Sequence, residues 1–121
     1  MIEGLLIGFW TLMSPMNIGI LVLGCVMGTF IGMMPGLGPV TAVSLLVPVV
    51  LTMQPATAMV LLAAIYYGAM FGGSTASVLI NAPGESSSVP TTFDGYPMAK
   101  KGLAGKALGR VEGGHLAPFW R

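Results

Sequence analysis

The sequence predicts an all-α integral membrane protein whose transmembrane and re-entrant helices are broken at Gly/Pro motifs. Hydrophobic residues make up 55% of the 121-residue chain and charged residues only 7%, whereas soluble domains carry about 25% charged residues. No charged residue occurs from Gly4 to Gly84, and every Lys and Arg lies at or beyond Lys100. The net charge of +1 gives no basic surface of the kind that binds nucleic acid.

Residues 2–13 are apolar but too short to cross a bilayer, which takes about 20 residues. Their large apolar side chains recur at near-helical spacing, and Trp10 would suit the headgroup level. We therefore expect an interfacial helix. Ser14-Pro15 then provides a helix cap and a first-turn proline for the helix that follows.

Residues 16–34 are predicted to form the first membrane helix, about 28 Å long at roughly 1.5 Å per residue. Gly24, Gly28 and Gly32 recur every four residues on one face, and Gly36 continues this spacing. Such a stripe lets another helix approach closely in lipid. The alternative is a sliding or substrate-facing surface.

The next segments contain further breaks. Residues 35–39, PGLGP, cannot continue a helix. They form either a plain turn or a re-entrant tip whose backbone groups meet a ligand. Residues 40–53 include Pro48 and are predicted to form a short, kinked or re-entrant membrane helix.

Residues 55–81 are predicted to form a membrane helix that is interrupted at 72–74. From Ser74 to Thr92 the sequence holds eight Ser or Thr residues and one Asn. A helix restarting after Gly72-Gly73 would present free N–H groups to a carboxylate. Hydroxyl, amide and carbonyl oxygens suit Na⁺, and we expect a possible Na⁺ site at Ser74, Thr75 and Asn81. No other metal and no cofactor is expected.

A substrate or ion site is therefore predicted around the Gly/Pro breaks and the hydroxyl-rich loop at 82–96. Its candidate residues are Gly36, Gly38, Gly72, Gly73, Ser74, Thr75, Asn81, Gly84, Ser86, Ser87, Ser88, Thr91 and Thr92. Residues 97–108 are predicted to form a basic helix. Because Lys and Arg concentrate in cytoplasmic loops, the segment 97–110 is expected to be cytoplasmic.

Three blocks of the sequence resemble a known family. They are GTFIGMMPGLGPVTAVSLLVP at 28–48, the long contiguous block PATAMVLLAAIYYGAMFGGSTASVLINAPGESSSVPTTFDGYPMA at 55–99, and GLAGKAL at 102–108. The chain resembles the N-terminal part of the large permease subunit of tripartite tricarboxylate transporters, the TctA family, over about residues 5–108, and we assign residues 1–108 to that part of the permease domain. The tail at 109–121 departs from the family's pattern, so we expect a truncated or frameshifted copy.

The resemblance implies an inverted-repeat secondary transporter in the bacterial inner membrane, crossing it several times. It would move tricarboxylates or related carboxylates by symport with Na⁺ or H⁺. The implied partners are a small membrane subunit and a periplasmic substrate-binding protein. A chain without the second repeat would be incomplete by itself.

Two other function classes compete with this one. The chain could be a non-transporting small membrane protein that acts as an assembly or interaction partner. A pore-forming peptide is disfavoured because the polar residues lie at breaks and not along one helix face. An enzyme is not expected, because no nucleophile–base pair, carboxylate pair or metal-ligand cluster is present in the sequence.

Overall fold

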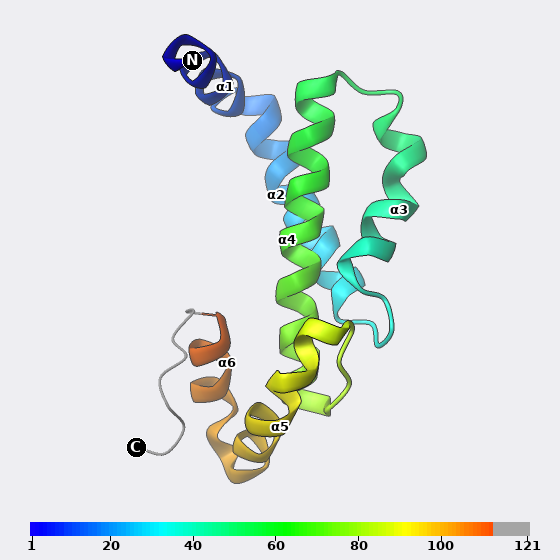
Figure 1. Ribbon diagram of the computed structural model, residues 1–121, viewed down its shortest axis with the longest axis vertical. Coiled ribbons are helices and arrows are strands. Elements are labelled where there is room, and N and C mark those ends of the chain that lie inside the picture. Colours follow the sequence, from blue (N-terminus) through cyan, green and yellow to red (C-terminus); the bar gives the residue numbers. More distant parts are fainter. Residues whose placement is uncertain (113–121) are drawn as a thin grey trace.

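The computed structural model describes residues 1–112, and these residues contain helices and no strand (Figure 1). In chain order the elements are α1 (Ile2–Leu12), α2 (Pro15–Gly32), α3 (Pro39–Val50), α4 (Pro55–Ile80), the 3₁₀ helix η1 (Ser86–Ser88), α5 (Val89–Met98), the π-helical segment η2 (Ala99–Leu103) and α6 (Ala104–Glu112). The predicted all-α class is confirmed. By length and composition, α2 and α4 are apolar enough to cross a membrane.

Prolines begin three of the apolar helices. Pro15, Pro39 and Pro55 each occupy the first turn, where a missing N–H is no loss and the fixed φ favours the helix. The helix starts predicted after Ser14 and at residue 55 are confirmed, but the Ser14 side chain makes no capping hydrogen bond. The predicted break at 35–39 is also confirmed, because α2 ends at Gly32 and α3 begins at Pro39.

Helices α2 and α4 run parallel and touch along their backbones. A Cβ placed on Gly28 would lie 2.9 Å from the Cα of Ile65, and one on Gly32 would lie 2.6 Å from the Cα of Ala69. The contact advances by one turn on both helices, so the two helices run in the same direction. The glycine stripe predicted on α2 therefore serves packing.

Helix α4 contributes its own glycines to the same contact. A Cβ on Gly68 would lie 3.0 Å from the backbone nitrogen of Thr29, and one on Gly72 would lie 2.9 Å from that of Met33. All four glycines of the contact are buried. Glycine on both sides lets the two helix backbones approach to van der Waals distance.

Helix α3 connects α2 to α4, running in the opposite direction, and packs beside α4 (Figure 1). At 12 residues it is about 18 Å long, so the loops on either side complete the return. The buried residues at its contact with α4 and α2 are Ala42, Leu61, Ile65 and Ala69, with Ile20, Ile31, Leu46, Val50 and Met53 packed around them. Pro48 lies inside α3, near its end.

The predicted interruption at 72–74 is wrong, because α4 continues without a break from Pro55 to Ile80. Gly72 and Gly73 are buried and helical, and Gly72 is required by the close approach of α2, not by a turn. The break expected near Pro83-Gly84 is present. Helix α4 ends at Ile80 and is capped by Asn81, whose φ of 57° and ψ of 32° are left-handed. Pro83 follows, as is common after a helix end.

Three further boundaries differ from the prediction. The loop expected at 82–96 becomes helical from Ser86, and α5 already starts at Val89. The single helix expected at 97–108 is divided at Gly102, whose φ of 76° reverses the chain between α5 and α6. Gly36 does not extend the glycine stripe, because α2 has ended and Gly36 takes a φ of 84° in the loop.

The predicted tail at 109–121 is described only to Glu112, where it continues α6. The rest of that prediction lies outside the described residues. Nothing places residues 2–13 at the membrane interface or 97–110 in the cytoplasm, so both assignments stay predictions.

Substitution of Gly32 by Ala tests the α2–α4 contact. The added methyl group must displace the backbone at Ala69, and overpacking of this kind typically destabilises by about 1–3 kcal/mol. Gly19→Ala is the matched control, since nothing lies within 4 Å of its Cβ position on the same helix. Thermal unfolding in detergent followed by circular dichroism should show a lower midpoint for Gly32→Ala only. Equal midpoints for the two variants would contradict the close contact.

Candidate functional site

The two Gly/Pro-rich loops meet beside the C-terminal part of α4, at the level where α2 ends. One comprises residues 33–38 and the other residues 82–88, and together we call them the loop junction. A Cβ on Gly38 would lie 3.3 Å from both the carbonyl oxygen of Gly84 and the Cβ of Glu85. Because α2 and α4 are parallel, segments more than 40 residues apart in the sequence come into contact here.

Backbone carbonyl groups gather in the loop junction. A Cβ on Gly84 would lie 3.4 Å from the carbonyl oxygen of Gly32, at the end of α2, and 3.7 Å from that of Leu37. The carbonyls at a helix C-terminus carry the negative end of the helix dipole. The junction therefore concentrates hard oxygen atoms with partial negative charge.

The second loop packs against Gly73 of α4. A Cβ on Gly73 would lie 3.6 Å from Oγ of Ser88, and the Cα of Gly73 lies 3.7 Å from the Cβ position of Gly84. Ser88 is buried, with 4% of its surface exposed. Below them, the buried Ser77 hydroxyl donates a 2.8 Å hydrogen bond to the carbonyl oxygen of Gly73. Gly73 thus has a local role different from the predicted break.

Several predicted site residues are bonded within their own helices. The hydroxyl of Ser74 donates to the carbonyl of Met70 at 3.1 Å, and that of Thr75 donates to the carbonyl of Phe71 at 3.0 Å. Since α4 is continuous there, Ser74 begins no new helix and the N–H groups expected beside it are bonded within α4. The structural premise of a carboxylate site at this point is wrong.

The predicted residues therefore fall into separate groups. The structure brings together Gly38, Gly73, Gly84 and Ser88, with Ser86 and Ser87 exposed on the adjoining 3₁₀ turn. It leaves the others apart from this contact: Gly36 in open space, Gly72 under α2, Asn81 exposed at the helix end, and Thr91 and Thr92 on α5. The Thr92 hydroxyl donates to the carbonyl of Val89 at 2.6 Å.

Glu85 is a member of the loop junction that the candidate list omitted. Its side chain is half-buried beside Gly38, and its Oε1 accepts a hydrogen bond from the Ser87 hydroxyl. Its charge could have revealed it, because Glu85 is the one Asp, Glu, Lys, Arg or His in the sequence between Glu3 and Asp94. A carboxylate next to hydroxyl and carbonyl oxygens can bind a cation.

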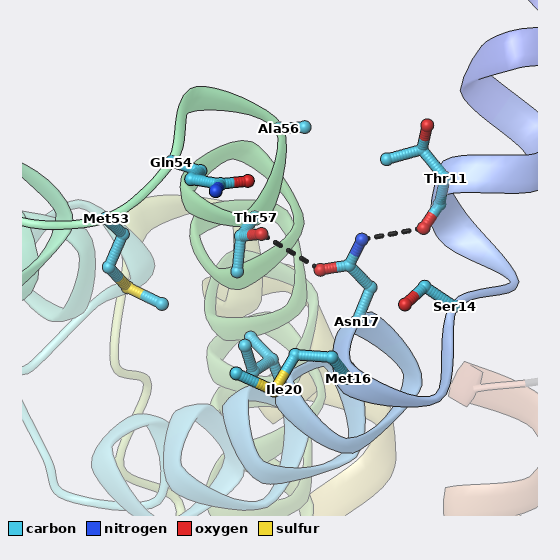
Figure 2. A pocket seen from close by; sticks show the side chains of 9 residues that line it. All are labelled: Thr11, Ser14, Met16, Asn17, Ile20, Met53, Gln54, Ala56 and Thr57. Carbon is cyan, nitrogen blue, oxygen red and sulfur yellow. Dashed lines mark hydrogen bonds between the residues drawn. The ribbon is translucent and has the colours of Figure 1, made fainter.

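A second polar cluster lies at the opposite end of α2 and α4, where both helices begin. Asn17 is 5% exposed. Its Nδ2 donates to the carbonyl of Thr11 at 2.6 Å, and its Oδ1 accepts from the Thr57 hydroxyl at 3.0 Å (Figure 2). The amide therefore joins α1, α2 and α4 through two hydrogen bonds.

A pocket of about 520 Å³ opens beside this amide (Figure 2). It is lined by Thr11, Ser14, Met16, Asn17, Ile20, Met53, Gln54, Ala56 and Thr57. Sequence reasoning missed this cluster. The signal for it was an uncompensated amide, Asn17, in an otherwise apolar predicted span.

Two apolar helices that pack through glycines are typical of helical membrane proteins. The family comparison makes the class specific. The model of the tripartite tricarboxylate transporter TctA family matches residues 18–112, and the chain belongs to this family. The match continues to Glu112, four residues past the point where the resemblance was expected to end. TctA is a family of transporters and not of enzymes, which fits the expectation of a non-enzyme.

One curated relative extends this likeness. The chain is 48% identical over 108 residues to an uncharacterized 52.8 kDa protein in the TAR-I ttuC' 3'region of Agrobacterium vitis. The aligned part covers 89% of this chain and 22% of that protein, so the chain spans about a fifth of the relative's length. No solved structure matches the chain.

A double-mutant cycle tests whether Asn17 and Thr57 stabilise the fold as a pair. Asn17→Ala and Thr57→Val each remove one side of the 3.0 Å hydrogen bond. Hydrogen bonds between membrane helices typically contribute about 0.6 kcal/mol and at most about 1.7 kcal/mol. Unfolding free energies in detergent should give a coupling energy in that range. In a control cycle, Thr52→Val takes the place of Thr57→Val; the Thr52 hydroxyl donates to the carbonyl of Val49, so this cycle should give no coupling energy. Strictly additive effects of Asn17→Ala and Thr57→Val would contradict the pairing.

Proposed function

We propose that this chain forms part of the permease of an ion-gradient-driven tripartite transporter for tricarboxylates or related carboxylates. The observation that carries the proposal is the loop junction, where two glycine-rich loops and their carbonyl and hydroxyl oxygens meet. Because the chain covers 22% of its relative, transport is proposed for the assembled transporter. Its partners would be a small membrane subunit and a periplasmic substrate-binding protein.

Neither loop of the junction contains a Lys or Arg to hold the substrate. Every Lys and Arg lies at or beyond Lys100, beyond the two loops. A carboxylate at the junction would therefore depend on hydroxyl donors, of which Ser86 and Ser87 are exposed and Ser88 borders Gly73. Irregular backbone at membrane depth is tolerated where protein or a cavity covers it, and packing of the two loops on α4 supports that condition.

A coupling cation would supply the missing positive charge. Glu85, the hydroxyl of Ser87 and the carbonyls near Gly84 offer hard oxygen ligands of the kind Na⁺ prefers. This moves the proposed cation site from Ser74, Thr75 and Asn81 to the loop junction. A cation next to the substrate carboxylate favours its binding, and the coupling must be reciprocal.

The fold also suggests an orientation in the inner membrane. If the basic segment 97–110 is cytoplasmic, the loop junction lies toward the cytoplasmic end of α2 and α4, and the Asn17 pocket toward the periplasmic end. A cysteine at position 105, in a Cys25→Ala background, should then react with an impermeant maleimide only after the membrane is opened. Gly4→Cys, near the other end of the molecule, is the comparison site. Labelling of the cysteine at position 105 in intact spheroplasts would show that the orientation is the reverse of the one proposed.

The proposed substrate contacts are tested with Ser86→Ala and Ser87→Ala, the two exposed junction hydroxyls, at the equivalent positions of a full-length family member with its partner subunits. Loss of one hydrogen bond to a charged group costs about 1.5–3 kcal/mol, or roughly 10- to 150-fold in affinity. Uptake of radiolabelled citrate at sub-saturating concentration should fall accordingly while membrane expression is unchanged. Ser44→Ala is the control, because its hydroxyl bonds to Val40 on α3, away from the junction.

Unchanged uptake in both Ser variants would remove the junction hydroxyls from the proposed site. If the chain proved to bind the small membrane subunit equally well in all variants while no variant affected uptake, the non-transporting assembly partner would become the better description.

The proposed cation site is tested with Glu85→Gln in the same full-length protein. This change preserves the size of the side chain and removes its charge. We expect the Na⁺ concentration for half-maximal uptake to rise at least tenfold, or the pH dependence to change if the coupling ion is H⁺. Glu3→Gln removes a charge at the other end of the molecule and should have no effect. An unaltered cation dependence in Glu85→Gln would place the ion elsewhere.

A further inference from the structure

Residues 97–112 carry four positive charges and one negative charge, that of Glu112. Lys100, Lys101, Lys106 and Arg110 are all the Lys and Arg residues of the described part of the chain. None of them forms an ion pair within residues 1–112. Lys100 is placed over the ring of Tyr96, 4.9 Å from its centroid. The positive charge of this group is thus left for something outside the fold.

These cations belong to a helical hairpin formed by α5, η2 and α6, on which the three lysines are exposed and Arg110 is half-buried. The positive φ of Gly102 turns the chain back, and α6 packs against α4 and α5. Ala107 is 2% exposed in that contact. The apolar residues of α6 share one face, whereas Lys106 and Arg110 are four residues apart and lie together on another.

The hairpin lies where a bilayer surface would be if α4 crosses the membrane. At 26 residues, α4 is about 39 Å long, longer than the hydrocarbon core of about 30 Å. Figure 1 shows α5 and α6 at the C-terminal end of α4, with α6 turned back toward it. Phe93 on α5 is 71% exposed and Leu103 is 38% exposed, so apolar side chains accompany the cations.

We propose that this hairpin, through Lys100, Lys101, Lys106 and Arg110, binds the anionic headgroups of membrane phospholipids. The cations complement the negative charge of the headgroups. Each Lys or Arg near an anionic leaflet strengthens binding to it by about 1 kcal/mol. An anionic protein partner would meet the same charges. The lipid is preferred because α6 packs directly against α4, which keeps the lipid surface within reach if α4 crosses the membrane. The proposal rests on the membrane disposition of α4 and not on transport.

The proposal is tested with the whole chain in detergent micelles, carrying an environment-sensitive fluorophore at Gly105→Cys in a Cys25→Ala background. Nothing lies within 4 Å of the Cβ position of Gly105, so the label is tolerated. Titration with phosphatidylglycerol should give a saturable change in emission that weakens with salt. Phosphatidylcholine should give no saturable change.

The matched variants separate charge from packing. Lys106→Gln with Arg110→Gln should weaken the apparent affinity for phosphatidylglycerol about 30-fold, from roughly 1 kcal/mol for each charge. Lys106→Arg with Arg110→Lys preserves the charge and should remain within about twofold. An equal response to the two lipids, or no effect of neutralisation, would overturn the proposal. Tighter binding of soluble polyglutamate than of phosphatidylglycerol would also overturn it, in favour of a protein partner. None of these readouts involves uptake, so failure here leaves the proposed transport untouched.

Discussion

Direct backbone contact between α2 and α4 is the constraint on which the rest of the structure depends. Lipid gives apolar helices no hydrophobic reason to associate, so helices in a membrane are held by close van der Waals packing. Gly28 and Gly32 on α2, and Gly68 and Gly72 on α4, remove the side chains that would keep the two axes apart. Because any methyl group on these positions would meet backbone atoms, the contact also fixes the register between the helices.

The parallel orientation of these two helices explains why the polar segments gather at the ends. Two parallel helices end on the same side, and the loop after α4 turns back along that helix, so that Gly84 lies beside Gly73 and the end of α2, and Gly38 lies against Gly84. Their beginnings must meet as well, and there Asn17 reaches Thr57. The chain is therefore apolar along its length, with polar chemistry at both ends.

Membership of the TctA family connects this arrangement to transport. Paired loops of irregular backbone give a transporter carbonyl and hydroxyl groups without a charged side chain buried in the membrane. Under the proposed topology, the cations of the α5–α6 hairpin would lie outside the bilayer and avoid the desolvation that a charge inside it would suffer. Glu85, at the loop junction, is the exception, and its position beside Ser87 is consistent with a functional role.

The sequence by itself determined the helical membrane class, the starts of the helices at Pro15 and Pro55, the packing stripe on α2 and the break at 35–39. These features depend on local chemistry, namely apolar runs, proline geometry and glycine spacing. The sequence could not decide the role of Gly72-Gly73, because a glycine pair is equally suited to ending a helix or to letting a neighbour approach. Only the tertiary structure decided it, since the backbone of α2 occupies the space beside Gly72 and keeps α4 continuous. For the same reason we now propose the site at the loop junction and not at Ser74. Which loops meet depends on the parallel register of α2 and α4, a contact between segments about 40 positions apart that no local pattern encodes.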